Sequence, residues 1–192
     1  MENPLADAYK LVSELLSYPE DLNLVEIEQT AGELVPWIAK EISDDVAHLI
    51  QSFVQDLKSI TPGEYIEALE LAPRCPLYLG YWAFKNEGVD SPQRRKYMAE
   101  LLDIYRKFGL SLGGKELPDF LPVMTEFLWI SYGTGQSDAR IKVINDHMKP
   151  WLPDMIACLE NPISPYAKLL RALQGLIGWD LQQSVPSPGE GS

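Results

Sequence analysis

The side chains most able to do chemistry in this 192-residue chain are its two histidines and two cysteines. A di-iron helix bundle requires Glu-x-x-His on two helices, because residues three apart share a helix face and can bind one metal. Here Asp45 stands three residues before His48, whereas Ile144 stands three residues before His147. The sequence also lacks a serine nucleophile elbow, a phosphate-binding glycine loop and a dinucleotide fingerprint. It therefore favours neither a metal site nor catalysis, and it predicts no cofactor.

The two cysteines, Cys75 and Cys158, are few and far apart in the sequence. Such a pair argues against a disulfide framework or a cysteine-rich metal site, so a reducing compartment is the simpler interpretation. Arg74 stands beside Cys75 and can make a thiol more reactive. The favoured hypothesis for Cys75 is nevertheless a small, buried, apolar residue, which is the commonest state of an isolated cysteine.

The charge balance excludes several classes of partner. Sixteen Lys and Arg against 28 Asp and Glu give a net charge of -12, which repels nucleic acid and anionic lipid surfaces. No stretch approaches the roughly 20 apolar residues of a membrane-spanning helix. The segment from Met1 to Asp7 carries the acidic residues Glu2 and Asp7 where a secretion signal carries lysine or arginine. We therefore expect a cytoplasmic protein without nucleic-acid binding or direct membrane insertion, either a monomer or a homodimer.

The elements that must position any site are helices. Apolar residues recur at helical spacing, prolines stand at helix starts, and period-2 alternation is nearly absent. The sequence predicts an all-α, single-domain bundle over residues 1–183 and a disordered tail over 184–192. The helix over 22–40 contains Gly32 and Pro36, so a break or kink is expected there. The predicted helices span 4–16, 22–40, 43–57, 61–69, 77–84, 91–108, 119–128, 137–148, 150–159 and 165–181.

Two segments carry a specific pattern. The helix over 101–110 ends in Tyr-x-x-x-Gly-Leu, and Lys115–Leu128 reads Glu-Leu-Pro-Asp-x-Leu-Pro before a Glu-Phe-Leu helix. This pattern resembles the NarJ/TorD family, the cytoplasmic maturation chaperones of molybdenum-cofactor oxidoreductases. Weaker similarity at 11–19, 74–79 and 164–170 extends the resemblance over nearly all of the chain except the tail. The order of the motif is closer to the nitrate reductase assembly branch than to the trimethylamine oxide reductase branch.

The resemblance implies a TorD-like helical bundle that makes or breaks no bond. Such a chaperone binds the N-terminal segment of the apo catalytic subunit of a molybdenum oxidoreductase. It assists cofactor insertion before export or membrane docking. Large aromatic rings can line a groove for such a peptide, and the chain has five tryptophans and nine tyrosines. The candidate peptide-binding residues are Tyr78, Trp82, Pro118, Asp119, Phe120, Leu121 and Glu126.

Two positions in this motif have more than one interpretation. The family usually places histidine after the Pro-Asp pair, where this chain has Phe120, so a pH-sensing role is dropped and an apolar groove contact is kept. Asp119 can cap the N–H groups of its own helix, contact a basic peptide, or do both. Binding must be reversible, which suggests micromolar affinity, on the order of -8 kcal/mol.

Two other functions stay open at this point. One is a small helical enzyme or metal carrier that acts through His48, His147 or Cys75. The other is a structural delta subunit that remains in the mature oxidoreductase, as some relatives are named. Metal content after purification tests the first alternative, and the composition of the active enzyme tests the second.

Overall fold

The computed structural model describes residues 3–70, 75–88, 90–114, 116–135 and 137–184. Within these ranges the regular structure is helical, and β-type pairing is limited to isolated bridges. The prediction of an all-α bundle is confirmed. No helix in the described ranges is long and apolar enough to span a membrane. In the described part of the chain, two π-helical segments and one 3-10 turn (Pro19–Asp21) accompany the helices. The helices are α1 (Pro4–Leu15), α2 (Leu24–Glu41), α3 (Asp44–Leu57), α4 (Pro62–Tyr65), α5 (Leu79–Phe84), α6 (Pro92–Lys107), α7 (Leu121–Tyr132), α8 (Ser137–Lys142), α9 (Leu152–Leu159) and α10 (Pro165–Gln183), and the π-helical segments are Ile66–Glu70 and Val143–Met148.

Local capping explains where several helices begin. Asn3 and Ser91 accept hydrogen bonds from the first turns of α1 and α6, and a proline follows each of them at the first helical position. At α4, Thr61 accepts from the backbone N–H of Glu64 while the Glu64 side chain accepts from the N–H of Thr61. This reciprocal arrangement is a capping box, and it fixes the start of α4.

The break expected in the second helix does not occur, because α2 continues through Pro36, and the alternative of a kink there stays a prediction. An internal proline costs a helix roughly 3 kcal/mol. Here α2 packs along α3 and buries Ile27, Leu34 and Ile38, whereas Pro36 lies on the exposed face. Burial of each such side chain contributes about 1.5–3 kcal/mol, so the tertiary packing outweighs the local cost.

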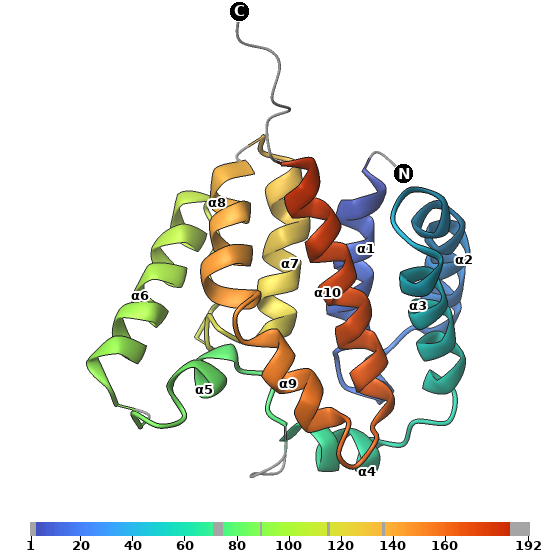
Figure 1. Cartoon of the computed structure of the whole chain (residues 1–192), viewed down its shortest axis with the longest axis horizontal. Helices are drawn as coiled ribbons and strands as arrows, with labels where there is room; N and C mark the ends of the chain where they lie inside the picture. The colour runs from blue at the N-terminus through green and yellow to red at the C-terminus, as the bar shows by residue number, and fades with distance from the viewer. Residues whose placement is uncertain (1–2, 71–74, 89, 115, 136, 185–192) are drawn as a thin grey trace, which may run out of the picture.

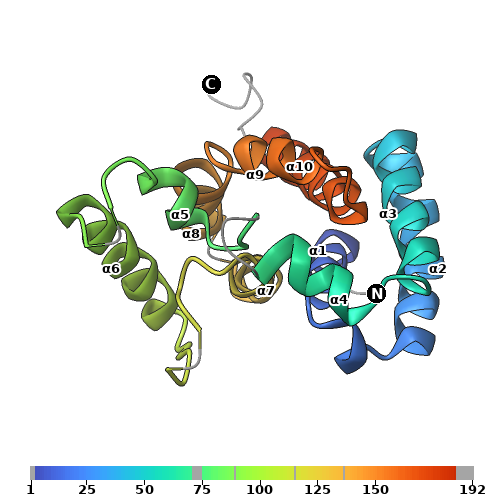
Figure 2. The same ribbon diagram turned by 90° about the horizontal axis from the view of Figure 1, so that it is seen from below.

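The long helices lie side by side (Figure 1). Helix α1 packs against α7, α10 and α2, while α10 packs against α3 and α9. Seen from below, α6 lies at one end of the molecule and the α2–α3 pair at the other (Figure 2). The short helices α4, α5 and α9 lie toward the lower end in Figure 1, where the chain passes between the long helices.

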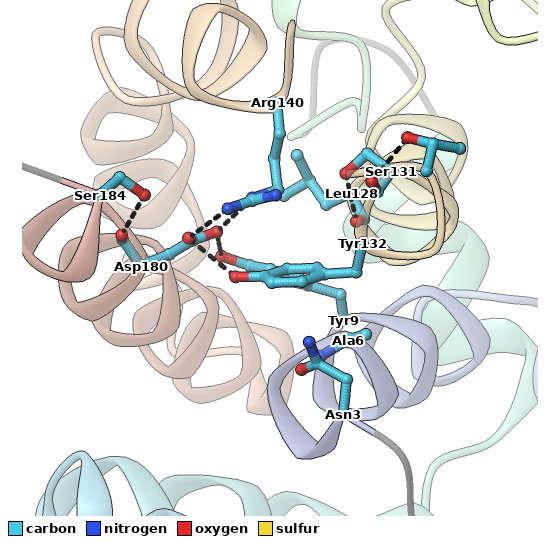
Figure 3. A network of polar contacts seen from close by, with 10 residues as sticks. Asn3, Ala6, Tyr9, Leu128, Ser131, Tyr132, Arg140, Asp180 and Ser184 are labelled. Carbon is cyan, nitrogen blue, oxygen red and sulfur yellow. Dashed lines mark hydrogen bonds and ion pairs between the residues drawn. The ribbon is translucent and has the colours of Figure 1, made fainter. Parts of the chain in front are cut away.

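A buried polar network joins four of these helices, and sequence reasoning did not predict it. The Asp180 carboxylate on α10 accepts hydrogen bonds from Arg140 Nε at 3.1 Å, Tyr9 OH at 2.9 Å and Tyr132 OH at 2.8 Å. These side chains converge from α8, α1 and α7 (Figure 3). The Arg140 guanidinium also lies 3.9 Å from the centroid of the Tyr132 ring, within cation–π distance. Burial raises the pKa of Tyr9 well above its ordinary range, so this phenol keeps the proton it donates.

The predicted disordered tail falls mostly outside the described residues. Ser184, its first residue, instead ends α10, where its Oγ donates to the Asp180 carbonyl oxygen at 2.8 Å. The rest of that tail, 185–192, is not described, and the domain boundary at residue 183 remains a prediction.

Candidate functional site

The structure brings together two segments that are distant in the sequence, each immediately before a helix. Leu79 N–H donates to the Asp119 carbonyl oxygen at 3.0 Å, and Leu121 N–H donates to the Leu77 carbonyl oxygen at 2.7 Å. This antiparallel bridge sets Tyr78 opposite Phe120, with ring centroids 4.9 Å apart. The pairing holds these residues extended, so α5 begins at Leu79 rather than at 77, and α7 begins at Leu121 rather than at 119.

Asp119 lies beneath this pairing and is completely buried. Its Oδ2 accepts a hydrogen bond from the Gly80 N–H at 2.9 Å, so the carboxylate caps α5. Of the two roles considered for Asp119, capping of its own helix does not occur, because α7 has Phe120 at its N-cap and no side-chain cap. Contact of Asp119 with a client peptide stays a prediction. Burial raises the pKa of Asp119, against the opposing effects of the Gly80 N–H and the Arg94 charge. A side chain at position 80 would displace the Asp119 carboxylate, because a Cβ there would lie 2.5 Å from Asp119 Oδ2.

Three other predicted residues support the site from inside. Pro118, Leu121 and Trp82 are buried. The Pro118 carbonyl oxygen accepts a hydrogen bond from Tyr105 OH at 2.8 Å, and Trp82 Nε1 donates to the Pro76 carbonyl oxygen at 3.0 Å. These two hydrogen bonds fix the backbone around the Tyr78–Phe120 pair.

The accessible part of the site is aromatic and acidic. Tyr78 and Phe120 are half-buried, and the neighbouring Leu117 is 46% exposed. Tyr78 OH donates to Glu116 Oε2 at 3.1 Å. Desolvation raises the pKa of Tyr78 to about 12, with further contributions from its hydrogen bond to Glu116 and from the charges of Glu116, Asp119 and Glu70. We call Tyr78, Phe120, Leu117 and Glu116 the Tyr78–Phe120 surface.

Glu126, the last predicted residue, faces elsewhere. It is exposed on α7 and lines a separate cavity of about 130 Å³. An α-helix rises about 1.5 Å per residue, so Glu126 lies about 7.5 Å along the axis from Leu121. The structure thus gathers Tyr78, Trp82, Pro118, Asp119, Phe120 and Leu121, and it leaves Glu126 further along the same helix.

A larger cavity, of about 860 Å³, lies away from the predicted residues. It is bounded by α6 and by the start of α8, and its lining combines Ile104 and Phe108 with charged side chains. Lys142 bridges two carboxylates at this cavity, those of Glu100 at 2.9 Å and Asp146 at 2.6 Å. The sequence did not indicate this cavity, because the cavity depends on the spacing between two helices that are separate in the sequence, α6 and α8.

The expectation that the two cysteines are unpaired was wrong, because Cys75 and Cys158 form a disulfide with a Cα–Cα distance of 5.8 Å. The packing of α5 against α9 brings the two residues together although they are 83 positions apart in the sequence. A chain with one cysteine pair gives no local signal of such bonding. The disulfide leaves Cys75 no free thiol to react, and Arg74 lies outside the described residues.

The histidines also fail to form a metal centre. His48 is exposed on α3, whereas His147 is buried in the π-helical segment after α8, where burial lowers its pKa. Within the described ranges, no three His, Cys, Asp or Glu side chains lie close enough to hold a metal ion.

The fold and site together define an all-helical protein with a half-exposed aromatic surface bordered by carboxylates. Residues 45–157, more than half of the chain, match the model of the family described as nitrate reductase delta subunit. The chain belongs to this family, and the resemblance to NarJ/TorD chaperones is confirmed.

Individual relatives agree with this assignment. The nitrate reductase molybdenum cofactor assembly chaperone NarJ of Escherichia coli K12 is 32% identical over 85% of this chain and 66% of its own length. The chain thus spans slightly less than two thirds of that relative. The nitrate reductase-like protein NarX of Mycobacterium tuberculosis H37Rv is 28% identical to this chain. The match covers 86% of this chain and 23% of NarX.

A solved structure from Archaeoglobus fulgidus has the same fold. It is described as a candidate redox enzyme maturation protein, and it superposes with a TM-score of 0.54 over 90% of this chain and 93% of its own. Sequence identity is 24%, so this likeness bears on the fold alone.

Proposed function

We propose that this chain is a chaperone that binds the N-terminal segment of the apo catalytic subunit of a molybdenum oxidoreductase and assists its cofactor insertion. The family assignment and the name of the E. coli relative support a client of the nitrate reductase type. The chain makes or breaks no bond in this role. We place it in the cytoplasm, before the client is exported or docked at a membrane.

The observation that carries the proposal is the Tyr78–Phe120 surface. Two adjacent rings on a rigid, hydrogen-bonded backbone can bury the apolar side of a peptide at low cost in conformational entropy. Glu116 and Glu70, whose charges act on Tyr78, would attract a lysine or arginine of the client segment. Charge complementarity of this kind accelerates association and restricts the choice of partner.

The remaining predicted residues take supporting roles in this proposal. Asp119, Trp82, Pro118 and Leu121 act as positioning residues beneath the surface, because all four are buried. Glu126 contacts the client only if the bound segment continues along α7. Release before maturation ends requires reversible binding, and we expect micromolar affinity, on the order of -8 kcal/mol.

Calorimetry with matched variants tests the site. The probe is a synthetic peptide of the N-terminal segment of the nitrate reductase catalytic subunit from the same genome. The double variant Tyr78→Ala/Phe120→Ala should bind this peptide about tenfold more weakly or worse, because truncation of buried aromatic contacts typically costs over 1–2 kcal/mol. Ala99→Trp, which obstructs the cavity bounded by α6 and α8, serves as the matched control and should bind as the wild type does.

The outcomes separate the site from the function. Loss of binding in Ala99→Trp but not in the double variant would indicate that the peptide binds in the α6–α8 cavity instead. Absence of binding by the wild-type chain would contradict the chaperone proposal for this client. Circular dichroism of each variant establishes that helical content is retained.

The family's description as a delta subunit favours a second function, that of a structural component of the mature enzyme. Purification of active nitrate reductase from the source organism distinguishes the two. A chaperone should be absent from the active enzyme at stoichiometric level, whereas a subunit should be present at one copy per catalytic subunit.

A further inference from the structure

The Cys75–Cys158 disulfide lies at the wall of a surface cavity. This cavity, of about 270 Å³, is lined by both cysteines, by Glu64 and Ala68 near α4, and by the turn after α9. Ile163, on that turn, is 90% exposed. Cys158 is half-buried, whereas Cys75 is 5% exposed. Of the two cysteines that line the cavity, Cys158 is therefore the more accessible residue.

The same disulfide holds the segment that carries the proposed site. Cys75 stands three residues before Tyr78, and the bond fastens this segment to α9. Further along, two hydrogen bonds hold the segment. Leu121 N–H donates to the Leu77 carbonyl oxygen, and Gly80 N–H donates to Asp119 Oδ2. The exposed ion pair of Lys85 and Asp154, 3.0 Å long, is another link between α5 and α9. Such an ion pair contributes little, so the covalent bond dominates this connection.

The remainder of the bundle is held together by contacts other than this bond. The central helices α1, α7, α10 and α3 pack on one another through their own apolar faces, and the Asp180 network joins α10 to α1, α7 and α8. Loss of the disulfide should therefore release one segment locally while the core stays folded, as local opening does in other proteins.

We propose that the Cys75–Cys158 bond is a thiol–disulfide exchange site that a dithiol reductant opens in the folded chain, freeing the Tyr78 segment from α9. A thiolate of the reductant attacks Cys158 Sγ, the protein disulfide breaks, and Cys75 leaves as a thiolate that takes up a proton. The second reductant thiol then attacks the mixed disulfide and releases Cys158 as a thiol. Two electrons pass to the protein, and the reductant becomes a disulfide.

This exchange also predicts an effect on client binding, and that part rests on the proposed function. The Tyr78–Phe120 surface is preorganised by its attachments, so its release from α9 should weaken peptide binding. The chain would then hold its client more tightly in the oxidised form than in the reduced form.

The test uses the full chain under native conditions and needs no client. Dithiothreitol is added, thiols are alkylated and counted by mass, and amide hydrogen exchange is followed. We expect two thiols per chain without denaturant. Exchange at Leu79, Gly80 and Leu121 should accelerate on the order of tenfold, and the amides of α10 should be unaffected.

Cysteine variants test the direction of attack and guard against nonspecific unfolding. In Cys75→Ser the remaining Cys158 should react faster with a thiol reagent than Cys75 does in Cys158→Ser. The double serine variant should reproduce the exchange pattern of the reduced wild type.

Three results would overturn the inference. These are thiols that appear only after denaturant is added, a reduced chain whose α10 amides exchange as in an unfolded protein, and two free thiols already present in the air-oxidised wild type. None of these readouts involves the client peptide, so failure here leaves the chaperone proposal intact, and failure to bind the peptide leaves the exchange site intact.

Discussion

At the scale of single residues, the buried Asp180 carboxylate connects α10 to three other helices through its hydrogen bonds. It accepts from Arg140, Tyr9 and Tyr132, and each of these donors lies on a different helix. Burial of an ion pair costs desolvation energy that its attraction barely repays, so the pair adds little net stability. We interpret its role as fixing the relative positions of α1, α7, α8 and α10.

Removal of the Asp180 carboxylate should lower the unfolding free energy substantially, even though the intact ion pair of Arg140 and Asp180 adds little net stability. Asp180→Ala leaves the Arg140 charge buried without a counter-charge, and such a change typically costs about 3–5 kcal/mol of unfolding free energy. Asp90→Ala, at an exposed position, is the matched control and should change the value by less than about 0.5 kcal/mol. Urea unfolding measures both, and equal losses in the two variants would contradict this role.

Asp119 gives a prediction with a defined pH dependence. Burial raises its pKa above the ordinary value of 3.8, so the folded chain holds this proton to higher pH than the unfolded chain does. As the pH rises above 3.8 through the raised pKa, the contribution of this carboxyl group to the unfolding free energy therefore decreases. Asp119→Asn keeps an oxygen for the Gly80 N–H and lacks this titration.

Relative to Asp119→Asn, the wild-type unfolding free energy should fall as the pH increases from 3.8 toward neutrality. Urea unfolding at a series of pH values measures the difference between the two chains. A difference that stays constant across this range would show that the folded-state pKa is not raised.

The site residues predicted from the sequence came from contiguous motifs, and their role in peptide binding stays a prediction. The pattern around Pro118–Phe120, together with the Tyr78 region, identified six residues that the fold gathers. It could not reveal that Asp119 caps a helix 39 positions earlier, or that Cys75 bonds Cys158. Both contacts depend on tertiary packing, which leaves no periodic signal in one sequence.

At the scale of elements, the close approach of α10 to α3 depends on a glycine. A Cβ at Gly175 would overlap the Val46 side chain on α3, whereas a Cβ at Gly178, one turn later, would meet nothing. The two positions lie on the same helix and differ in their surroundings, so they form a matched pair.

Gly175→Ala should destabilise the chain by about 1–3 kcal/mol, because it overpacks the interface of α10 with α3. Gly178→Ala should stabilise it by about 0.5–1 kcal/mol, since alanine restricts the unfolded chain and fits the helix. Thermal or urea unfolding compares them. A loss in Gly178→Ala, or none in Gly175→Ala, would contradict the packing described for α10.

Helix starts were predictable because their signals are local. The sequences at Asn3-Pro4, Thr61-Pro62 and Ser91-Pro92 each supply a capping side chain and a first-turn proline. The starts of α5 and α7 were placed two residues early, because an antiparallel bridge between them competes with the helix. The continuity of α2 through Pro36 was missed for the same kind of reason, since packing on α3 decides it.

At the scale of the whole molecule, the buried network and the proposed binding surface occupy opposite ends of the bundle. Asp180 lies near the end of α10 and Tyr9 lies in α1, whereas Leu121 begins α7 at the lower end in Figure 1. This separation lets the network fix the helices while the bridge between α5 and α7 forms the surface. Stability and peptide affinity should therefore respond to different substitutions.

In the proposed function, the Tyr78–Phe120 surface contacts the N-terminal segment of the client. Photo-crosslinking in cells that express the apo catalytic subunit tests it most directly, with p-benzoylphenylalanine in place of Phe120 or, as the control, in place of Ala99 at the α6–α8 cavity. Position 120 should capture the N-terminal segment, identified by mass spectrometry, and position 99 should not. Capture from position 99 alone, or a crosslink from position 120 to another part of the subunit, would contradict it.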